Sequence, residues 1–277
     1  MVIVLMILKW DSARPEPLSE LWRVFLTGML VVFPVALFEA FLEGFFREMY
    51  LSSNTYILVE SFIIAGLCEE FAKLQIVMRK IYKNPAFDEH MDGIVYSVMA
   101  SMGFALLENI FYVFKHGIGT GILRCFTAVP MHAMTTGIMG YYIGSSIFYA
   151  KKEERNELIY KGLFIAIFIH GTYDYFCFSH GMGILILPWL FAVYTYLKRL
   201  MDLAKLHDME IVRMREINRQ ADGPDFNAAV PVEKNLPRGS ADFETTDAAV
   251  FTTYCVKCGA ENPETNSVCS KCGEILS

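Results

Sequence analysis

Apolar residues dominate six separate stretches of this chain, and polar residues separate the stretches. A helix needs about 20 mainly apolar residues to cross the hydrocarbon core of a bilayer. The pattern therefore predicts an all-α, polytopic membrane protein whose membrane-embedded domain covers residues 1–203. The predicted spans are Leu21–Phe41, Thr55–Met78, Asp92–Phe114, Ile122–Tyr149, Leu158–Phe178 and Gly183–Leu200. The apolar segment Met1–Leu8 is too short to span, and we expect it to lie at the membrane interface.

Lysine and arginine gather in alternate connections between these spans. Cytoplasmic loops of membrane proteins are enriched in these residues, so the clusters mark the cytoplasmic face. With six spans, all of the clusters fall on one face, which places both termini in the cytoplasm. The clusters contain Lys9, Arg14 and Arg23; Arg79, Lys80 and Lys83; Lys151, Lys152 and Arg155; and Lys198 and Arg199. The opposite connections carry little beyond Arg47 and Lys115.

The last quarter of the chain is polar, and we predict a polar helix extension followed by a flexible linker over residues 204–250. Residues 251–277 hold two Cys-x-x-Cys pairs that are separated by ten residues, and a glycine follows each pair. This spacing is typical of a structural zinc site with four thiolate ligands. The ligands would be Cys255, Cys258, Cys269 and Cys272. A redox pair or disulfides are the alternatives, and both are less typical of a cytoplasmic segment.

The candidate chemistry lies inside the spans, where ionisable residues are costly and are therefore functional candidates by default. Four spans contain them in short motifs. The motifs are CEEFAK (Cys68–Lys73), GFALLEN (Gly103–Asn109), MHAMTTG (Met131–Gly137) and HGTYD (His170–Asp174). Glutamate, histidine, aspartate and lysine gathered in one helical bundle indicate a hydrolytic site, although each motif alone has a structural explanation.

Two of these motifs place a pair of ionisable residues four positions apart, on one helix face. Glu69 and Lys73 form either a structural ion pair or, with Glu70 beside them, a carboxylate arrangement suited to general-base catalysis. His170 and Asp174 form either a hydrogen-bonded pair between helices or a histidine that is oriented by a carboxylate.

The other two motifs contribute Glu108, which lies deep in the third span, and His132, which follows Pro130 by two residues. We expect Pro130 to kink the fourth span. Arg124 lies just inside the same span, two turns from His132. Along straight spans Glu69 falls toward the cytoplasmic half of the membrane, whereas Glu108, His132 and Asp174 fall toward the outer half.

Charged residues elsewhere in the spans have simpler interpretations. Glu39, Glu43 and Arg47 are spaced four apart, and we assign them to a polar stripe near the outer interface. The Gly140-x-x-x-Gly144 spacing predicts a close contact between two helices. The net charge of −6 and the absence of a basic face with interleaved aromatic residues argue against a nucleic-acid partner.

The order of these motifs resembles the PrsW-type intramembrane proteases, which are related to the type II CAAX prenyl proteases. The resemblance covers about 21–200 and rests on Glu69-Glu70-x-x-Lys73, Asp92 with GFALLENIFY, Arg124 with VPMHAMTTGIMGYYIG, and HGTYDY. It implies an enzyme of a prokaryotic cell membrane that cleaves membrane-anchored regulatory proteins, typically anti-sigma factors. The zinc-ribbon tail lies outside this resemblance, and a protein partner at the ribbon is an open expectation.

The resemblance also implies roles for individual residues. Glu69 would activate the attacking water, with Glu70 beside it; His132 and His170 would be the catalytic histidines; and Asp174 would support His170. Related enzymes have a histidine where this chain has Glu108. Either Glu69 and a histidine activate the water without a metal, or His132, His170 and a carboxylate hold a catalytic zinc.

Three classes of function fit the membrane motifs. The first is an intramembrane endopeptidase. The second is a catalytically silent scaffold that keeps the polar cluster for helix packing. The third is a transporter that uses the carboxylates and histidines as a proton relay. No inverted repeat of hydropathy is visible, which argues against the transporter.

Overall fold

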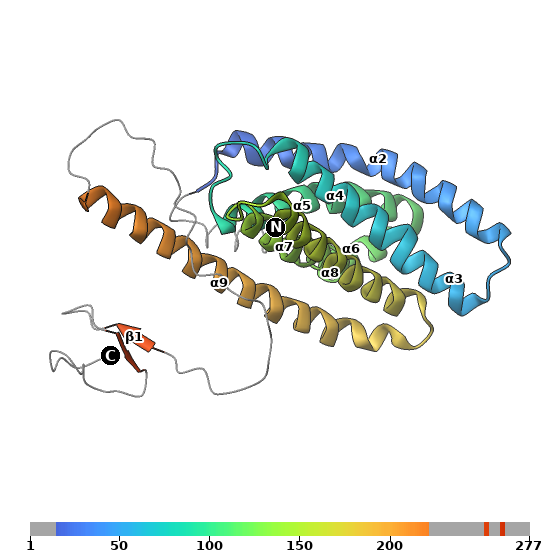
Figure 1. The fold of residues 1–277 in the computed structure, drawn as a ribbon. Helices are drawn as coiled ribbons and strands as arrows, with labels where there is room; N and C mark the ends of the chain where they lie inside the picture. The colour runs from blue at the N-terminus through green and yellow to red at the C-terminus, as the bar shows by residue number, and fades with distance from the viewer. Residues whose placement is uncertain (1–14, 222–251, 255–260, 264–277) are drawn as a thin grey trace. The chain divides into compact units, whose positions relative to one another are not determined.

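The computed structural model describes residues 15–221, 252–254 and 261–263 of the chain (Figure 1). The chain divides into two compact units, Met1–Ala228 and Ala229–Ser277. The helices of the first unit are α2 (Leu18–Glu48), α3 (Ser53–Val59), the π-helix η1 (Glu60–Leu67), α4 (Cys68–Lys80), α5 (His90–His116), α6 (Ile118–Phe126), α7 (Ala128–Ser146), α8 (Lys152–Phe178), the 3-10 helix η2 (Met182–Leu185) and α9 (Ile186–Ala221). In the second unit, β1 (Thr252–Tyr254) pairs antiparallel with β2 (Glu261–Pro263).

The helical, polytopic fold class is confirmed, and each of the six predicted spans coincides with a helical segment. The second span is built from α3, η1 and α4, which follow one another without a break over residues 53–80. Within the described residues, three helices are long and apolar enough to cross a membrane by length and composition: Leu18–Glu48, His90–His116 and Met182–Met214. The extension of the last span as a polar helix is also observed, because α9 continues to Ala221.

The fourth predicted span is not one helix, which corrects the continuous span expected over residues 122–149. It is divided into α6 and α7 at Thr127, whose φ of −123° and ψ of −72° are not helical. Pro130 lies in the first turn of α7, where a proline lacks no needed hydrogen bond and favours helix initiation. The expected kink at Pro130 is therefore a helix start, preceded by a break.

Helices α5 and α7 form the centre of the bundle. Figure 1 shows them between α2 on one side and α9 on the other; α5 contacts both of these helices, and α7 contacts α9. The predicted close contact at Gly140 and Gly144 occurs here. A Cβ atom at Gly140 would lie 2.3 Å from the carbonyl oxygen of Gly93, and one at Gly144 would lie 2.4 Å from that of His90. Any larger residue at these two positions would force α5 and α7 apart.

The outer surface of the bundle is apolar, as a lipid-facing surface must be. Helix α2 exposes large side chains along one face, including Trp22, Leu30 and Leu37. Helix α8 similarly exposes Phe164 and Phe168. Contiguous exposed apolar surface of this kind is rare in monomeric soluble proteins, so it agrees with a bilayer as the surrounding solvent.

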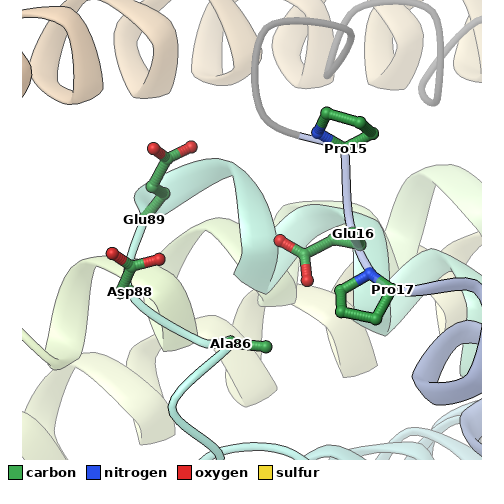
Figure 2. Close-up of a pocket in the computed structure, with 6 residues that line it drawn as sticks. All are labelled: Pro15, Glu16, Pro17, Ala86, Asp88 and Glu89. Carbon is green, nitrogen blue, oxygen red and sulfur yellow. The ribbon is translucent and has the colours of Figure 1, made fainter.

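The polar end of the bundle, around the start of α5, contains an open hollow of about 320 Å³. Figure 2 shows its lining residues, Pro15, Glu16, Pro17, Ala86, Asp88 and Glu89. Nearby, Oδ2 of Asp92 accepts the backbone N–H groups of Asp88 and Glu89 at 2.7 Å each, which caps α5. Asp92, a residue of the family resemblance, therefore has a structural contact at this helix start. Glu108 lies about 24 Å further along α5 than Asp92, counted at about 1.5 Å per residue.

Candidate active site

The ionisable residues of the four motifs meet in one buried cluster, although they come from four different helices. Glu69, Glu70 and Lys73 lie on α4, Glu108 on α5, His132 on α7, and His170 with Asp174 on α8. The side chains of Glu70 and Lys73 have no exposed surface, and His132 and His170 are 2% exposed. Such burial inside an apolar bundle is tolerated only where charges are paired or functional.

Lys73 is the centre of the hydrogen bonds in this cluster. Its Nζ atom donates to Glu69 Oε2 at 3.1 Å and to Glu70 Oε1 at 2.8 Å, as the helical spacing of these residues predicts. Its third donor points to Nδ1 of His132 at 2.9 Å. Because an ammonium group has three donors and no acceptor, all three are used here.

The contacts of His132 define how its ring is protonated. Nδ1 must accept the hydrogen bond from Lys73, because the ammonium group can only donate. Nε2 lies 2.9 Å from Oε2 of Glu108, and a carboxylate accepts from a ring N–H. The lone pair of His132 therefore points toward Lys73 and Glu69, whose Oε2 is 3.7 Å from Nδ1.

His170 lies between two carboxylates. Its Nδ1 is 2.9 Å from Oε1 of Glu70, and its Nε2 is 3.2 Å from Oδ2 of Asp174. The predicted pair of His170 and Asp174 is therefore present, and Glu70 contacts the opposite nitrogen. The ring is nearly perpendicular to that of His132, with centroids 5.0 Å apart. The second carboxylate of the Glu-Glu pair thus orients a histidine from another helix.

Glu108 connects the cluster to α6. Its Oε2 accepts from His132 and also lies 2.8 Å from the Arg124 guanidinium, which stacks 3.6 Å above the ring of Tyr112. The side chains of Glu108 and Arg124 are 16% and 15% exposed, so this edge of the cluster is the more open one. The carboxylate of Glu108 thus orients the ring of His132.

The profile of the PrsW family intramembrane metalloproteases matches residues 16–198. The chain belongs to this family. "Protease PrsW" of Geobacillus kaustophilus is 39% identical over 60% of this chain and 70% of the relative, and "Protease PrsW" of Bacillus subtilis is 36% identical over 60% and 72%. "Protease PrsW" of Oceanobacillus iheyensis is 34% identical over 66% and 84%. No solved structure matches the chain.

A zinc-ribbon profile matches residues 254–276, in agreement with the ribbon predicted at the end of the chain. The four predicted zinc ligands, Cys255, Cys258, Cys269 and Cys272, lie outside the described residues. This PrsW-family chain is therefore a multi-pass membrane protease with a zinc-ribbon domain at its end.

Straight spans would place Glu69 at a different depth from the other site residues, but the structure brings these side chains into one cluster. The break at Thr127 is one reason. His132 is only the fifth residue of α7, while the outer part of the predicted span is the separate helix α6. A boundary shift of a few residues also moves a side chain by about 5 Å, which is enough to close the remaining difference.

Three contributors to the cluster were not among the predicted site residues. Thr136 donates to Oε2 of Glu70 at 3.0 Å, and Ser101 donates to the backbone carbonyl of His132 at 2.8 Å. The third is Glu39 on α2, which interacts electrostatically with Glu69, Glu108, His170 and Lys73. Hydroxyl groups are common in membrane helices, so the two hydroxyl residues could not be singled out.

The predicted polar stripe of Glu39, Glu43 and Arg47 is wrong in its first member. Glu43 and Arg47 do form a surface ion pair of 3.8 Å, with side chains that are 41% and 71% exposed. Glu39 does not belong to that surface pair, since its Oε1 atom is buried. A signal was present in the sequence: Glu39 follows Val35 by four residues and Val32 by seven, and both valines face inward.

Three residues of the cluster could hold a metal ion. Glu69, His132 and His170 each offer one ligand atom, and these atoms lie within 4.8 Å of one another. Two imidazoles and a carboxylate are a donor set that is frequent in catalytic zinc sites. Behind them, Glu108 contacts His132 and Glu70 contacts His170, as carboxylates behind zinc-bound histidines do.

Proposed function

We propose that this protein is an intramembrane endopeptidase that uses a zinc ion held by Glu69, His132 and His170 to hydrolyse membrane-anchored regulatory proteins. The convergence of these three donors from three helices, within 4.8 Å of one another, is the observation that carries the proposal. The proposal extends the family assignment to a defined set of residues and to a class of substrate.

The charge of the cluster supports a divalent cation. Five carboxylates lie in or beside it, whereas Lys73 and Arg124 are the permanently charged bases that contact it. The carboxylates are Glu39, Glu69, Glu70, Glu108 and Asp174. An excess of negative charge in an apolar bundle is costly, and a divalent cation at the two histidines would offset most of it.

Zinc bound by these three residues would supply Lewis acidity, which acidifies water and polarises a peptide carbonyl. The protein's own groups have complementary tasks. Oε2 of Glu69, which Lys73 contacts, would be the oxygen that binds the ion, and Oε1 is left to accept the proton of the attacking water. Glu108 fixes the tautomer of His132, whose Nδ1 would bind zinc in place of its contact with Lys73. One nitrogen of His170 would bind zinc in place of its carboxylate contact, and the carboxylate at the other nitrogen, Glu70 or Asp174, would orient the ring.

The membrane location constrains the substrate. A cluster buried among membrane helices can reach a peptide bond only if the substrate segment enters the bilayer or its edge. We therefore assign the substrate to membrane-anchored proteins and, from the family resemblance, to regulators such as anti-sigma factors that are released by a first cleavage. The zinc ribbon is then available to contact a further protein partner.

Hydrolysis of a defined peptide tests the proposal directly. The purified full-length protein is incubated with a set of fluorescence-quenched transmembrane peptides, each a Leu/Ala helix with one short polar interruption at a different depth. The proposal expects cleavage within the interruption of at least one peptide, loss of cleavage in Glu69→Gln, and unchanged cleavage in Glu43→Gln. A scaffold would cleave none of the peptides. A transporter would likewise cleave none but would move protons across proteoliposomes.

A further inference from the structure

The inward face of α2 ends in a carboxylate. Residues on this face recur at spacings of three and four, so they form one stripe along the helix. The buried members are Leu21, Val24, Gly28, Val32 and Val35. Glu39 is the next position of the stripe, one turn beyond Val35. A carboxylate on the buried side of a membrane helix needs the same functional explanation as those in the four motifs.

This end of the stripe faces the active-site cluster. Val32 and Val35 pack against Phe104 of α5, and Cys68 and Ala72 of α4 contact the same group of side chains. One turn further, Glu39 interacts electrostatically with Glu69 and Lys73 of α4, Glu108 of α5 and His170 of α8. Helix α2 is thereby the fifth helix that borders the cluster, and it contributes a further carboxylate.

The hydrogen bonding of Glu39 differs from that of the other carboxylates. Its Oε1 atom is buried and has no hydrogen-bond partner within the described part of the chain. Glu70, by contrast, receives Lys73 and His170 at Oε1 and Thr136 at Oε2. The carboxylates of the four motifs hydrogen-bond to other residues of the cluster, whereas Oε1 of Glu39 is left to accept a hydrogen bond from another group.

An intramembrane protease creates a specific need for such an acceptor. A peptide bond can be attacked only after its segment has left the helical conformation, and this frees backbone N–H groups. In an apolar environment a free N–H group costs several kcal/mol unless it finds an acceptor. The enzyme must therefore provide a hydrogen-bond acceptor beside the reacting bond.

We propose that Glu39 is a substrate-binding residue whose Oε1 atom accepts a backbone N–H of the unwound substrate segment next to the scissile bond. The ligand is thus an extended peptide backbone, and the contact is independent of the substrate's side chains. This assignment rests on the proposed function, because it requires a peptide in the cluster. It gives Glu39 a role in binding, and leaves the attack on the carbonyl to the other residues.

Steady-state kinetics with the peptide that the wild-type protein cleaves fastest separate binding from chemistry. Glu39→Leu removes the acceptor and should raise KM by about threefold to tenfold, the range for loss of one hydrogen bond between uncharged groups. Its kcat should stay within about threefold, because an interaction made equally in both states affects KM alone. Glu39→Gln retains an acceptor and should change KM less than Glu39→Leu does. Glu43→Leu, four residues further on the same helix, is the matched control and should leave both constants unchanged.

Two kinetic outcomes would overturn the assignment. A fall in kcat with unchanged KM in Glu39→Leu would place Glu39 in the chemical step. Kinetic constants of Glu39→Leu that match those of Glu43→Leu would show that the carboxylate has no contact with the substrate. Wild-type protein that cleaves no peptide at all would count against the proposed function itself, which distinguishes the two failures.

Replacing single backbone amides of the same peptide by esters identifies the hydrogen bond. Each ester removes one N–H group from the segment around the cleavage site. One position should raise KM for wild-type protein and have little further effect in Glu39→Leu. If Glu39→Leu does not fold, Glu39→Met takes its place, because methionine is close to glutamate in length and offers no oxygen acceptor. The penalty of the ester should then also be lost. An ester penalty that is the same in wild type and variant at every position would overturn the assignment.

Discussion

Asp208 of α9 caps the first turn of α5, more than a hundred residues away in sequence, through His90. Oδ1 of Asp208 accepts the backbone N–H of His90 at 2.8 Å and lies 2.7 Å from its Nδ1, while Oδ2 accepts the N–H of Met91 at 3.0 Å. The His90 ring also stacks on Phe148, with centroids 4.1 Å apart. The polar extension of α9 is thus fastened to the helix that carries Glu108 at its other end.

Removal of this cap should weaken the bundle. Asp208→Ala leaves two N–H groups at the start of α5 without their acceptor, and caps of this kind contribute about 1–2 kcal/mol. We expect the free energy of unfolding in mixed detergent micelles, titrated with SDS, to fall by about that amount. Asp208→Asn keeps one acceptor oxygen and should cost less. Asp202→Ala, an exposed position six residues earlier on α9, is the control; an equal loss there would contradict the capping role.

The sequence predicted the helices and the residues of the site, but not which residues of different helices contact one another. The helical spans and the residues of the four motifs followed from hydropathy and from the cost of charges in lipid. Contacts between helices distant in sequence, such as Lys73 with His132, did not, because helical periodicity gives the face of a residue but not its partner. Asp208 likewise carried no signal within its polar, charged helix.

Two predictions, the continuous fourth span and the surface position of Glu39, were wrong because one local pattern was considered without its neighbours along the helix. Hydropathy predicts the fourth span as one continuous helix with a kink at Pro130, although the glycines of α6 and Pro130 equally mark a helix start. Glu39 was grouped with Glu43 and Arg47 by spacing alone. The inward valines that precede Glu39 at the same spacing were the better guide, since burial of a helix face continues along its axis.

The site residues should act as a unit in catalysis. Glu69→Gln, His132→Ala and His170→Ala should each lower kcat for the transmembrane peptide by a factor of about 10² to 10⁴. The double variant of Glu69→Gln with His170→Ala should be little worse than either single variant, because groups that act together are non-additive. Asp174→Asn should be milder, since an amide oxygen can still accept from His170. Additive losses, or a well-folded Glu69→Gln protein with full activity, would refute this arrangement.

Metal content distinguishes the two zinc sites. Elemental analysis of the full-length wild-type protein should give two zinc ions per chain. The double variant Cys255→Ser with Cys258→Ser should retain one, and His132→Ala should also retain one. The triple variant that combines these changes should retain none. A wild-type content of one zinc that disappears with the cysteines would leave the membrane cluster without a metal and favour water activation by Glu69 and a histidine alone.

Cysteine labelling in intact cells tests the orientation in the membrane. The one-sided distribution of Lys and Arg predicts that cysteines placed at Lys83, at Lys152 and at the C-terminus are protected from a membrane-impermeant reagent. Cysteines at Ser53, Gly117 and His180 should react. The test is made in a background that lacks the native cysteines. Labelling at Lys152 in sealed cells would contradict the six-span topology with cytoplasmic termini.

Lys73 offers the sharpest test of how the cluster is held together. Lys73→Met removes the ammonium group shared by Glu69, Glu70 and His132 and leaves two buried carboxylates facing each other. Breaking a buried ion pair from one side costs about 3–5 kcal/mol, so the variant should unfold at much lower SDS than wild type. Removing one charge from the opposite side should restore part of the loss. Lys73→Met with Glu69→Gln is therefore expected to be more stable than Lys73→Met alone, while remaining inactive.

Lys198→Met, on the exposed side of α9, is the control and should have little effect. If Lys73→Met with Glu69→Gln were less stable than Lys73→Met, the lysine would stabilise the bundle by packing, as over the Phe104 ring at 4.6 Å, and not by neutralising the carboxylates.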